Sequence, residues 1–375
     1  MNDQQRIAAV VRQFQIDGEL SGVVPYGSGH INDTYCVVFD RSGVSTRSIV
    51  QRINTTIFRN PAALMENIQR VTSHLAAKLA GEPDSARHVL TLIPARDGLA
   101  WHVDALGSYW RAYRFIEGAR TYDAVESPQQ AYQAAKAFGV FQKLLVDLPA
   151  PRLHDTIPDF HDTAKRFAAF AMAVDEDVAN RAAHARAEIE FAFAHQSMVS
   201  ILLDANLPER VTHNDTKFNN VLLDEASGEG LCVIDLDTVM PGLALYDFGD
   251  MVRTATSAAM EDEQDLKRVT MQFPMFEAVT RGYLSSAGSF LTKAEKQHLA
   301  FAGKLITFEQ GIRFLTDYLA GDAYYKVHRE GQNLDRCRTQ FKLVESIEEQ
   351  EEQMNRLVSG LLDGSAERGR QQTSE

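Results

Sequence analysis

Long apolar segments are missing from this chain of 375 residues. The longest purely apolar run covers residues 167–174, which is far shorter than the roughly 20 residues of a membrane-spanning helix. The N-terminal residues 1–6 contain no basic segment that leads into an apolar one, so the sequence predicts no secretory signal. We therefore expect a protein without a membrane partner.

Cysteines and basic residues are also scarce. Cys36, Cys232 and Cys337 are odd in number and far apart, which predicts a reduced, cytoplasmic setting rather than a disulfide framework, and their spacing resembles no zinc site. The chain has 38 Lys and Arg against 51 Asp and Glu, which gives a formal net charge of −13. This acidic balance argues against a nucleic-acid partner, because binding to a phosphate backbone requires a basic surface.

The most informative segment of the chain is a polar loop between apolar runs. Residues 211–224 have the sequence VTHNDTKFNNVLLD, and residues 231–237 have the sequence LCVIDLD after a short glycine-containing turn. We expect the two apolar runs to pair as a hairpin. The loop then provides a carboxylate, Asp215, and an amide, Asn220. A second carboxylate, Asp235, lies at the end of the returning strand.

An acid, an amide and a second acid around one point are the groups that phosphoryl transfer from a nucleotide requires. One carboxylate orients and deprotonates the attacking hydroxyl, and hard oxygen ligands hold Mg²⁺ on the phosphates. The pattern H-x-D-x-x-x-x-N, followed by an apolar strand that ends in Asp, is typical of kinases. Asp and Asn also serve simply as turn residues, and Asn214 and Asp224 fit that role. The combined spacing of Asp215, Asn220 and Asp235 favours a kinase.

The hydrophobic period divides the chain into two lobes. Short β-branched strands around one long helix at residues 61–80 predict a small antiparallel sheet lobe at 1–117, which binds the nucleotide. Beyond it, a helical period predicts a large, mainly helical lobe at 118–363 that binds the acceptor, followed by a polar, disordered tail at 364–375. The predicted fold class is α+β, a bilobal protein-kinase-like fold with the nucleotide in the cleft between the lobes.

Two segments have the pattern of long single helices. The first covers residues 1–20, and the second covers the alanine-rich residues 177–204. The apolar stripe of the first helix is formed by Ile7, Val10, Val11 and Phe14. After this helix, residues 35–39 and 48–53 predict a strand hairpin.

A glycine-containing loop, YGSGHIND at residues 26–33, begins the small lobe. Gly27 and Gly29 lie between two expected strands, where backbone N–H groups could fold over phosphates. A tight hairpin turn uses glycine equally well. His30 extends this loop, where it either faces the cleft and bonds the phosphate acceptor or is an exposed loop histidine.

The strand after this loop lacks the lysine that grips nucleotide phosphates in many kinases. Its sequence is IVQRI, so Gln51 or Arg52 is left to take that place. Side chains alternate along a strand, and this alternation decides which of the two faces the cleft. Glu66 in the following helix could pair with the residue that does.

Two further features have a functional and a structural interpretation. Phe115, Ile116 and Glu117 end the last strand of the small lobe, where the backbone could bind adenine or could simply end a strand. Lys217 is the one basic residue of the polar loop. A point charge there could neutralise the phosphate in transit, and a solvated lysine is the alternative.

A row of charges lies beside the apolar stripe of an expected helix in the C-terminal lobe. Glu309, Arg313 and Asp317 follow one another at intervals of four residues. Such a row is commonly an exposed ladder of ion pairs worth a few tenths of a kcal/mol each. Together with aromatic residues such as Tyr324 it could instead form the polar wall of a sugar pocket.

Five sequence motifs give the chain a family resemblance. They are QRINTTIF at 51–58, RVTHNDTK at 210–217, IDLDT at 234–238, DFGD at 247–250 and RFLTDYL at 313–319. The H-x-D loop resembles the aminoglycoside phosphotransferase and choline kinase superfamily. Over nearly its whole length the chain is similar to the bacterial N-acetylhexosamine 1-kinases, to which the NDTK form of the loop and the QRIN strand point.

This resemblance implies a reaction and a set of site residues. The γ-phosphoryl group of ATP is transferred to the anomeric hydroxyl of N-acetylglucosamine or N-acetylgalactosamine, which gives the 1-phosphate. Asp215 is then the general base at the sugar, and Asn220 and Asp235 are the Mg²⁺ ligands. The residues implied to contact the sugar are His30, Arg313 and Tyr324.

Two alternatives compete with a sugar kinase. The acceptor could be an amino alcohol or an aminoglycoside, but both are cationic and would favour a cluster of acids over a row centred on Arg313. The chain could also be a nucleotide-binding pseudokinase that acts as a scaffold. The presence of Asp215, Asn220 and Asp235 together argues against a scaffold.

Overall fold

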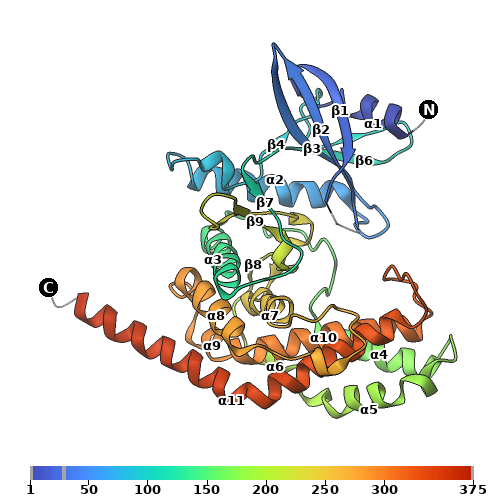
Figure 1. The fold of residues 1–375 in the computed structure, drawn as a ribbon, viewed down its shortest axis with the longest axis vertical. Helices are drawn as coiled ribbons and strands as arrows, with labels where there is room; N and C mark the ends of the chain where they lie inside the picture. The colour runs from blue at the N-terminus through green and yellow to red at the C-terminus, as the bar shows by residue number, and fades with distance from the viewer. Residues whose placement is uncertain (1–2, 28–30, 373–375) are drawn as a thin grey trace.

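The computed structural model describes residues 3–27 and 31–372 of the chain (Figure 1). An antiparallel sheet with two helices forms the N-terminal part, and the remainder is mainly helical. This arrangement confirms the predicted α+β fold with a sheet region followed by a helical region. Among the described residues, no helix has both the length and the apolar character that crossing a membrane requires.

Six strands form the sheet: β1 (Glu19–Pro25), β2 (Asp33–Arg41), β3 (Val44–Arg52), β4 (Leu92–Ile93), β5 (His102–Val103) and β6 (Tyr109–Arg114). They are antiparallel in the order β1-β2-β3-β6-β4, and β5 pairs with the first residues of β6. The predicted hairpin of residues 35–39 and 48–53 is confirmed by the pairing of β2 with β3. Its turn contains Ser42 and Gly43, both at positive φ.

The N-terminal helix is shorter than predicted. Helix α1 (Asp3–Val11) ends before Phe14, and the chain then turns at Gly18, with φ +106°, into β1. The backbone of Gln15 donates to the backbone oxygen of Pro94 at 2.9 Å instead of continuing the helix. The prediction of one helix over residues 1–20 is wrong because the apolar stripe covers the sheet and does not extend a helix.

The second helix of the sheet region is α2 (Pro61–Lys78). It connects the sheet region to the helical region. It begins where the sequence predicts, with Pro61 in the first turn and the side chain of Asn60 accepting from the backbone N–H of Ala63. The side chain of Asn67 donates to the backbone oxygens of His154 at 2.8 Å and Val239 at 3.1 Å. In Figure 1, α2 accordingly lies between the sheet and the helices.

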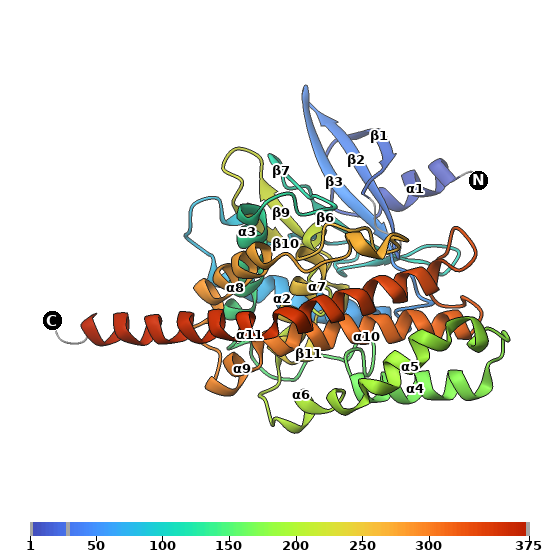
Figure 2. The ribbon, with the colours of Figure 1, turned by 60° about the horizontal axis from the view of Figure 1, so that its bottom comes forward.

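The helical region consists of α3 (Pro128–Leu144), α4 (Thr163–Glu176), α5 (Arg186–Ala194), α6 (Ile201–Asp204), α7 (Ala244–Ala255), α8 (Phe273–Ala287), α9 (Lys293–Gln297), α10 (Leu299–Leu319) and α11 (Gln332–Gln372). Helix α10 is buried along most of its length and lies beside α11 (Figures 1 and 2). Helix α7 approaches α10 so closely that a Cβ on Gly249 would lie 2.4 Å from the backbone oxygen of Ala302.

One predicted helix of this region differs from the structure. The predicted helix at 177–204 becomes α-helical only at Arg186, because Asp177 and Asn180 adopt left-handed φ values of 36° and 54° after α4. It is interrupted again between α5 and α6. Helix α11 extends as far as Gln372. The disorder of the tail at 364–375 stays a prediction.

Two small sheets lie at the boundary of the two regions. Strands β9 (Val221–Asp224) and β10 (Gly230–Val233) form the predicted hairpin, and β7 (Ala119–Arg120) pairs with β9. Strand β8 (Arg210–Thr212) pairs with β11 (Met240–Gly242). The polar loop between β8 and β9 is thereby held next to the chain that leaves the large sheet.

Candidate active site

The polar loop at residues 213–220 is fixed by a buried carboxylate from α7. The carboxylate of Asp247 accepts hydrogen bonds from the backbone N–H groups of His213 at 2.9 Å and Asn214 at 2.6 Å. The Nε2 atom of Gln142 donates to it at 2.6 Å. Burial raises the pKa of Asp247, and these hydrogen bonds oppose the rise. Asp247 of the DFGD motif thus fixes the backbone of the loop. This role was not predicted from the sequence.

Asp215 lies in this loop with a cation and an amide beside it. The Nζ atom of Lys217 lies 3.0 Å from its carboxylate. The side chain of Asn220 donates to the backbone oxygen of Asp215 at 2.8 Å and to its carboxylate at 3.1 Å. Burial acts to raise the pKa of Asp215, but Lys217 and His213 outweigh it and lower that pKa. Asp215 is therefore an ionised carboxylate at neutral pH and can accept a proton.

Asp235 follows β10 in a left-handed conformation, with φ 58°. Burial raises its pKa to about 6, and the neighbouring carboxylates of Asp237 and Asp215 add to the rise. Within the described part of the chain, no side chain or backbone group donates a hydrogen bond to its carboxylate. Lys217 and Arg111 oppose this rise, and Asp235 is thus a carboxylate without a hydrogen-bond donor that a further cation would stabilise.

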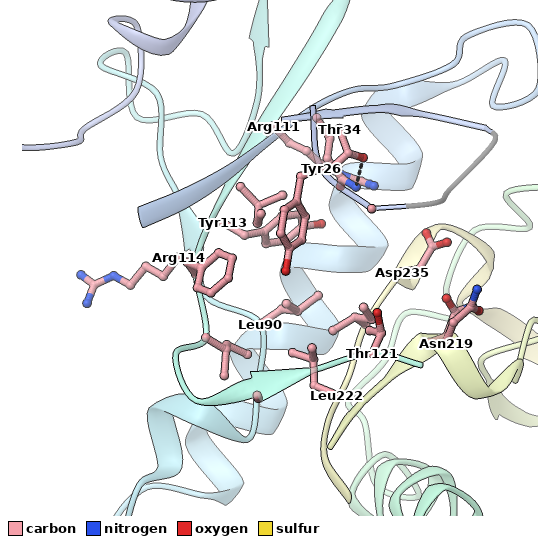
Figure 3. Close-up of a pocket in the computed structure, with 18 of the residues that line it drawn as sticks. Tyr26, Thr34, Leu90, Arg111, Tyr113, Arg114, Thr121, Asn219, Leu222 and Asp235 are labelled. Carbon is pink, nitrogen blue, oxygen red and sulfur yellow. Dashed lines mark hydrogen bonds between the residues drawn. The ribbon is translucent and has the colours of Figure 1, made fainter. Parts of the chain in front are cut away.

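A pocket between the sheet and the hairpin connects these groups (Figure 3). Thr34 and Arg111 lie at the top of the pocket in Figure 3, Asn219 and Asp235 lie at its right, and the ring of Tyr26 points into it. Seven residues that the sequence analysis assigned to the site line this pocket. They are Gly27, Gln51, Phe115, Ile116, Lys217, Asn220 and Asp235. Asp215 borders the pocket through its contacts with Lys217 and Asn220.

Three residues assigned from the sequence lie elsewhere. Arg52 pairs with Asp33 on the outer face of the sheet, because side chains alternate along β3 and Gln51 takes the inner face. Glu117 is exposed and pairs with Arg47. Glu66 lies 2.9 Å from His154 and not beside β3.

Two assigned residues, Gly29 and His30, lie outside the described residues. Of the glycine-containing loop, the structure describes Tyr26, Gly27 and residues 31–33. The side chain of Asn32 donates to the carboxylate of Asp237 at 2.6 Å. The end of the loop is therefore tied to the hairpin.

Two buried charges at the pocket, Arg111 and Asp237, were not predicted as site residues from the sequence. Arg111 in β6 is only 1% exposed and forms an ion pair with Asp237, which follows Asp235 in the IDLD motif. An arginine among the aromatic residues of a predicted strand was the available signal, since a buried charge needs a partner. The partner could not be identified from the sequence, because it is 126 residues away.

A second polar cluster lies next to the loop that carries Asp215. It surrounds Glu309, Arg313 and Asp317, the charge row of α10. Glu309 and Asp317 are both buried, so the row is not a solvated ladder of ion pairs. The carboxylate of Glu309 lies 2.7 Å from Nδ1 of His161 and accepts from Thr163 at 2.5 Å. The Nε2 atom of His161 lies 3.0 Å from the backbone oxygen of Asn214. The cluster therefore contacts the loop one residue before Asp215.

Arg313 lies in the middle of this cluster and contacts aromatic rings. Its guanidinium carbon is 4.9 Å from the ring centroid of Phe160 and 5.9 Å from that of Tyr325, and it donates to Gln310 at 3.1 Å. Asp317 accepts hydrogen bonds from the backbone N–H groups of Tyr324 at 2.7 Å and Tyr325 at 2.9 Å. Asp317 thus orders the loop after α10, and the side chain of Tyr324 is 57% exposed.

Comparison with known protein families matches residues 22–279 to the Phosphotransferase enzyme family. The match covers the large sheet, the hairpin and the helices as far as α8. The chain belongs to this phosphotransferase family. It is therefore a phosphotransferase that acts on small molecules.

Solved structures share the fold of this phosphotransferase at low sequence identity. An aminoglycoside phosphotransferase from Alicyclobacillus acidocaldarius is 11% identical, with a TM-score of 0.59 and 97% of each chain covered. A microcompartment-associated aminopropanol kinase is 16% identical, with a TM-score of 0.57, and 94% of this chain and 99% of that chain are covered. The ADP-bound aminoglycoside phosphotransferase APH(2'')-Ib is 13% identical, with a TM-score of 0.52 and coverage of 92% and 99%. These similarities establish the kinase-like fold and leave the acceptor open.

Proposed function

We propose that this phosphotransferase is an ATP-dependent N-acetylhexosamine 1-kinase, which phosphorylates the anomeric hydroxyl of N-acetylglucosamine or N-acetylgalactosamine. The observation that carries this proposal is the charge of the cluster beneath Asp215. Its carboxylates are occupied by internal partners, while Arg313 and Arg166 form no ion pair with any described residue. A neutral, oxygen-rich acceptor suits such a site.

A cationic acceptor is disfavoured by the same charges. Glu309 is bound by His161 and Thr163, and Asp317 by backbone N–H groups, so neither is free to bind an ammonium group. Among the described residues, Arg166 donates only to the backbone oxygen of Phe160, at 3.2 and 3.1 Å. Amines and aminoglycosides would therefore meet like charge there, which disfavours binding. Within the proposal, Arg313, Tyr324 and His30 contact the sugar.

The chemical roles follow from the loop and the hairpin. An anomeric hydroxyl is more acidic than an ordinary alcohol, so the ionised carboxylate of Asp215 can orient it and accept its proton. Lys217, whose pKa is raised chiefly by Asp215, remains a cation and stabilises the phosphoryl group in transit. ATP would occupy the pocket between the lobes, with its adenine near Phe115 and Ile116.

The residues at the hairpin fit Mg²⁺, which we propose as the metal. Within residues 3–27 and 31–372, no group of three or more His, Cys, Asp and Glu side chains is arranged to hold a metal. Mg²⁺ needs no such group, since it is held through one or two protein oxygens together with substrate phosphates and waters. Asp235, whose buried carboxylate has a raised pKa, and Asn220 would hold it, and the metal would neutralise charge on the phosphates.

The decisive experiment measures ADP release with a panel of acceptors. We expect turnover with N-acetylglucosamine or N-acetylgalactosamine, and none with aminopropanol, ethanolamine or kanamycin. The 1-O-methyl glycoside of each sugar is the matched control, because its anomeric oxygen carries no proton and cannot accept phosphate. Phosphorus NMR should show an anomeric phosphate on the product.

Two other results would replace the proposal. Turnover with an amine acceptor would identify an amino-alcohol or aminoglycoside kinase. If ATP binds without turnover of any acceptor in the panel, the protein would be a nucleotide-binding scaffold.

A further inference from the structure

Arg111 is a buried cation that points into the nucleotide pocket from an unexpected strand. It lies in β6 directly opposite Gln51 of β3, so both side chains are on the same face of the sheet. Its Nε atom donates to Gln51 at 2.9 Å, and the side chain of Gln51 donates to Thr34 at 3.0 Å. All three residues line the pocket.

The guanidinium of Arg111 is fixed by two partners, but not all of its nitrogen atoms donate a hydrogen bond. Its Nη1 atom forms the ion pair with Asp237, and its Nε atom is bound by Gln51. Its Nη2 atom has no hydrogen-bond partner in the part of the chain that the structure describes. Across the pocket lies the free carboxylate of Asp235 (Figure 3). One terminal N–H group of Arg111 is thus available to a ligand that lies between the sheet and Asp235.

We propose that Arg111 binds the phosphates of the nucleotide and takes the place of the lysine that β3 lacks. This inference rests on the proposed ATP-dependent function. Neighbouring strands lie about 4.8 Å apart, so a long side chain from β6 can reach the space that a lysine of β3 would occupy. The free Nη2 group can donate a charge-assisted hydrogen bond to a phosphate oxygen.

Asp237 is the positioning residue for Arg111. Its carboxylate binds the guanidinium of Arg111 and also accepts from Asn32 at 2.6 Å. Asn32 in turn accepts from the backbone N–H of Asn54 at 2.9 Å. Asp237 therefore joins β6, the end of the glycine-containing loop and the hairpin at one point. This geometry fixes the direction of the guanidinium before any nucleotide arrives.

The alternative role for Arg111 is purely structural, as an ion pair between lobes. The two roles differ in which ligand they affect. A phosphate-binding arginine contributes to the affinity for ATP and ADP but not to that for adenosine, which has no phosphate. A structural ion pair would change the affinity for all three ligands together, through the shape of the pocket.

Calorimetric titration of the full chain with Mg-ATP, ADP and adenosine tests this inference. In Arg111→Met we expect the affinity for ATP and ADP to fall by roughly 10- to 150-fold, the range for a charge-assisted hydrogen bond. The affinity for adenosine should stay unchanged, and Arg111→Lys should restore part of the loss. Arg52→Met is the matched control, because Arg52 is paired with Asp33 away from the pocket, and it should bind all three ligands normally.

A double variant removes the risk of misfolding. Arg111→Met alone leaves the carboxylate of Asp237 buried without its partner, whereas Arg111→Met/Asp237→Asn removes both charges. The folded double variant, verified by its melting temperature, should show the same selective loss for ATP and ADP. Wild-type affinity for ATP in this variant would overturn the inference and leave the proposed function intact. A wild-type protein that binds no ATP would overturn the proposed function, and this inference with it.

Discussion

The imidazole of His161 and the carboxylate of Glu309 form a buried pair, with Nδ1 and Oε1 2.7 Å apart. Burial acts against both charges, but each partner stabilises the charge of the other. The pKa of His161 is raised by Glu309, and the pKa of Glu309 is lowered by His161. The pair lies beneath Asn214 and therefore supports the loop that carries Asp215.

The stability of the fold should depend on pH through this pair. Because the pKa of Glu309 is lowered on folding, its contribution is present above about pH 4.3 and is lost as the pH falls through the lowered value. Because the pKa of His161 is raised, its contribution is full below about pH 6.5 and is lost as the pH rises through the raised value. The contribution should therefore be greatest between about pH 4.3 and 6.5.

Urea unfolding across this pH range checks the expectation. The free energy of unfolding of the wild type, minus that of His161→Asn/Glu309→Gln, should pass through a maximum in the window and decrease on both sides. The double variant removes both charges and so serves as the reference. A difference that does not change with pH would mean that the two groups are not charged in the fold.

Replacing the base should remove catalysis and preserve binding. Asp215→Asn keeps the shape of the side chain but removes the proton acceptor beside Lys217. We expect kcat to fall by roughly 10²–10⁴-fold, the usual contribution of a general base. ATP affinity, measured by calorimetry, should remain within a few fold of the wild-type value. Unchanged turnover would show that another group accepts the proton.

Replacing the proposed metal ligand should change the dependence on Mg²⁺. Asp235→Ala removes a hard oxygen ligand and should abolish turnover, with partial recovery only at high Mg²⁺. The measurement is the initial rate as a function of Mg²⁺ concentration. Asp224→Ala, at the other strand end of the hairpin, is the control, because Asp224 pairs with Arg87 away from the pocket. If both variants have the same Mg²⁺ dependence as the wild type, Asp235 is a structural residue.

Removing Arg313 should affect the acceptor and not the nucleotide. A hydrogen bond from a guanidinium to a sugar oxygen is worth about 1.5–3 kcal/mol. Arg313→Ala should therefore raise KM for the N-acetylhexosamine by roughly 10- to 150-fold. KM for ATP should barely change, because the pocket of Figure 3 contains no residue of α10. A normal sugar KM would place the acceptor elsewhere.

The close contact of α7 with α10 provides a test of the fold. A Cβ at position 249 would meet the backbone of Ala302 at 2.4 Å, so Gly249→Ala should destabilise the protein by about 1–3 kcal/mol, as overpacking does. The matched control is Gly360→Ala in α11, where a Cβ meets no atom within 4 Å. That substitution should leave stability unchanged or raise it by about 0.4–1 kcal/mol. Chemical unfolding of both variants measures the difference.

The local features of this protein were set by its sequence. Proline and a capping asparagine define the start of α2, and alternating apolar residues define the β2–β3 hairpin. The hairpin of residues 221–233, which brings Asn220 and Asp235 to one pocket, is also a short-range feature. These elements depend on neighbours in the sequence, so periodicity and motif spacing were sufficient to predict them, together with the α+β fold class.

Only the tertiary structure decided which charges meet. Arg111 and Asp237 come from different lobes, and the burial of Glu309 depends on His161, which is 148 residues away. The same holds for Gln51 and Arg52, since the face of a strand is chosen by what packs against the sheet and not by the strand itself. Sequence patterns report local conformation, whereas a buried charge is stabilised by a partner that only the folded chain brings within reach.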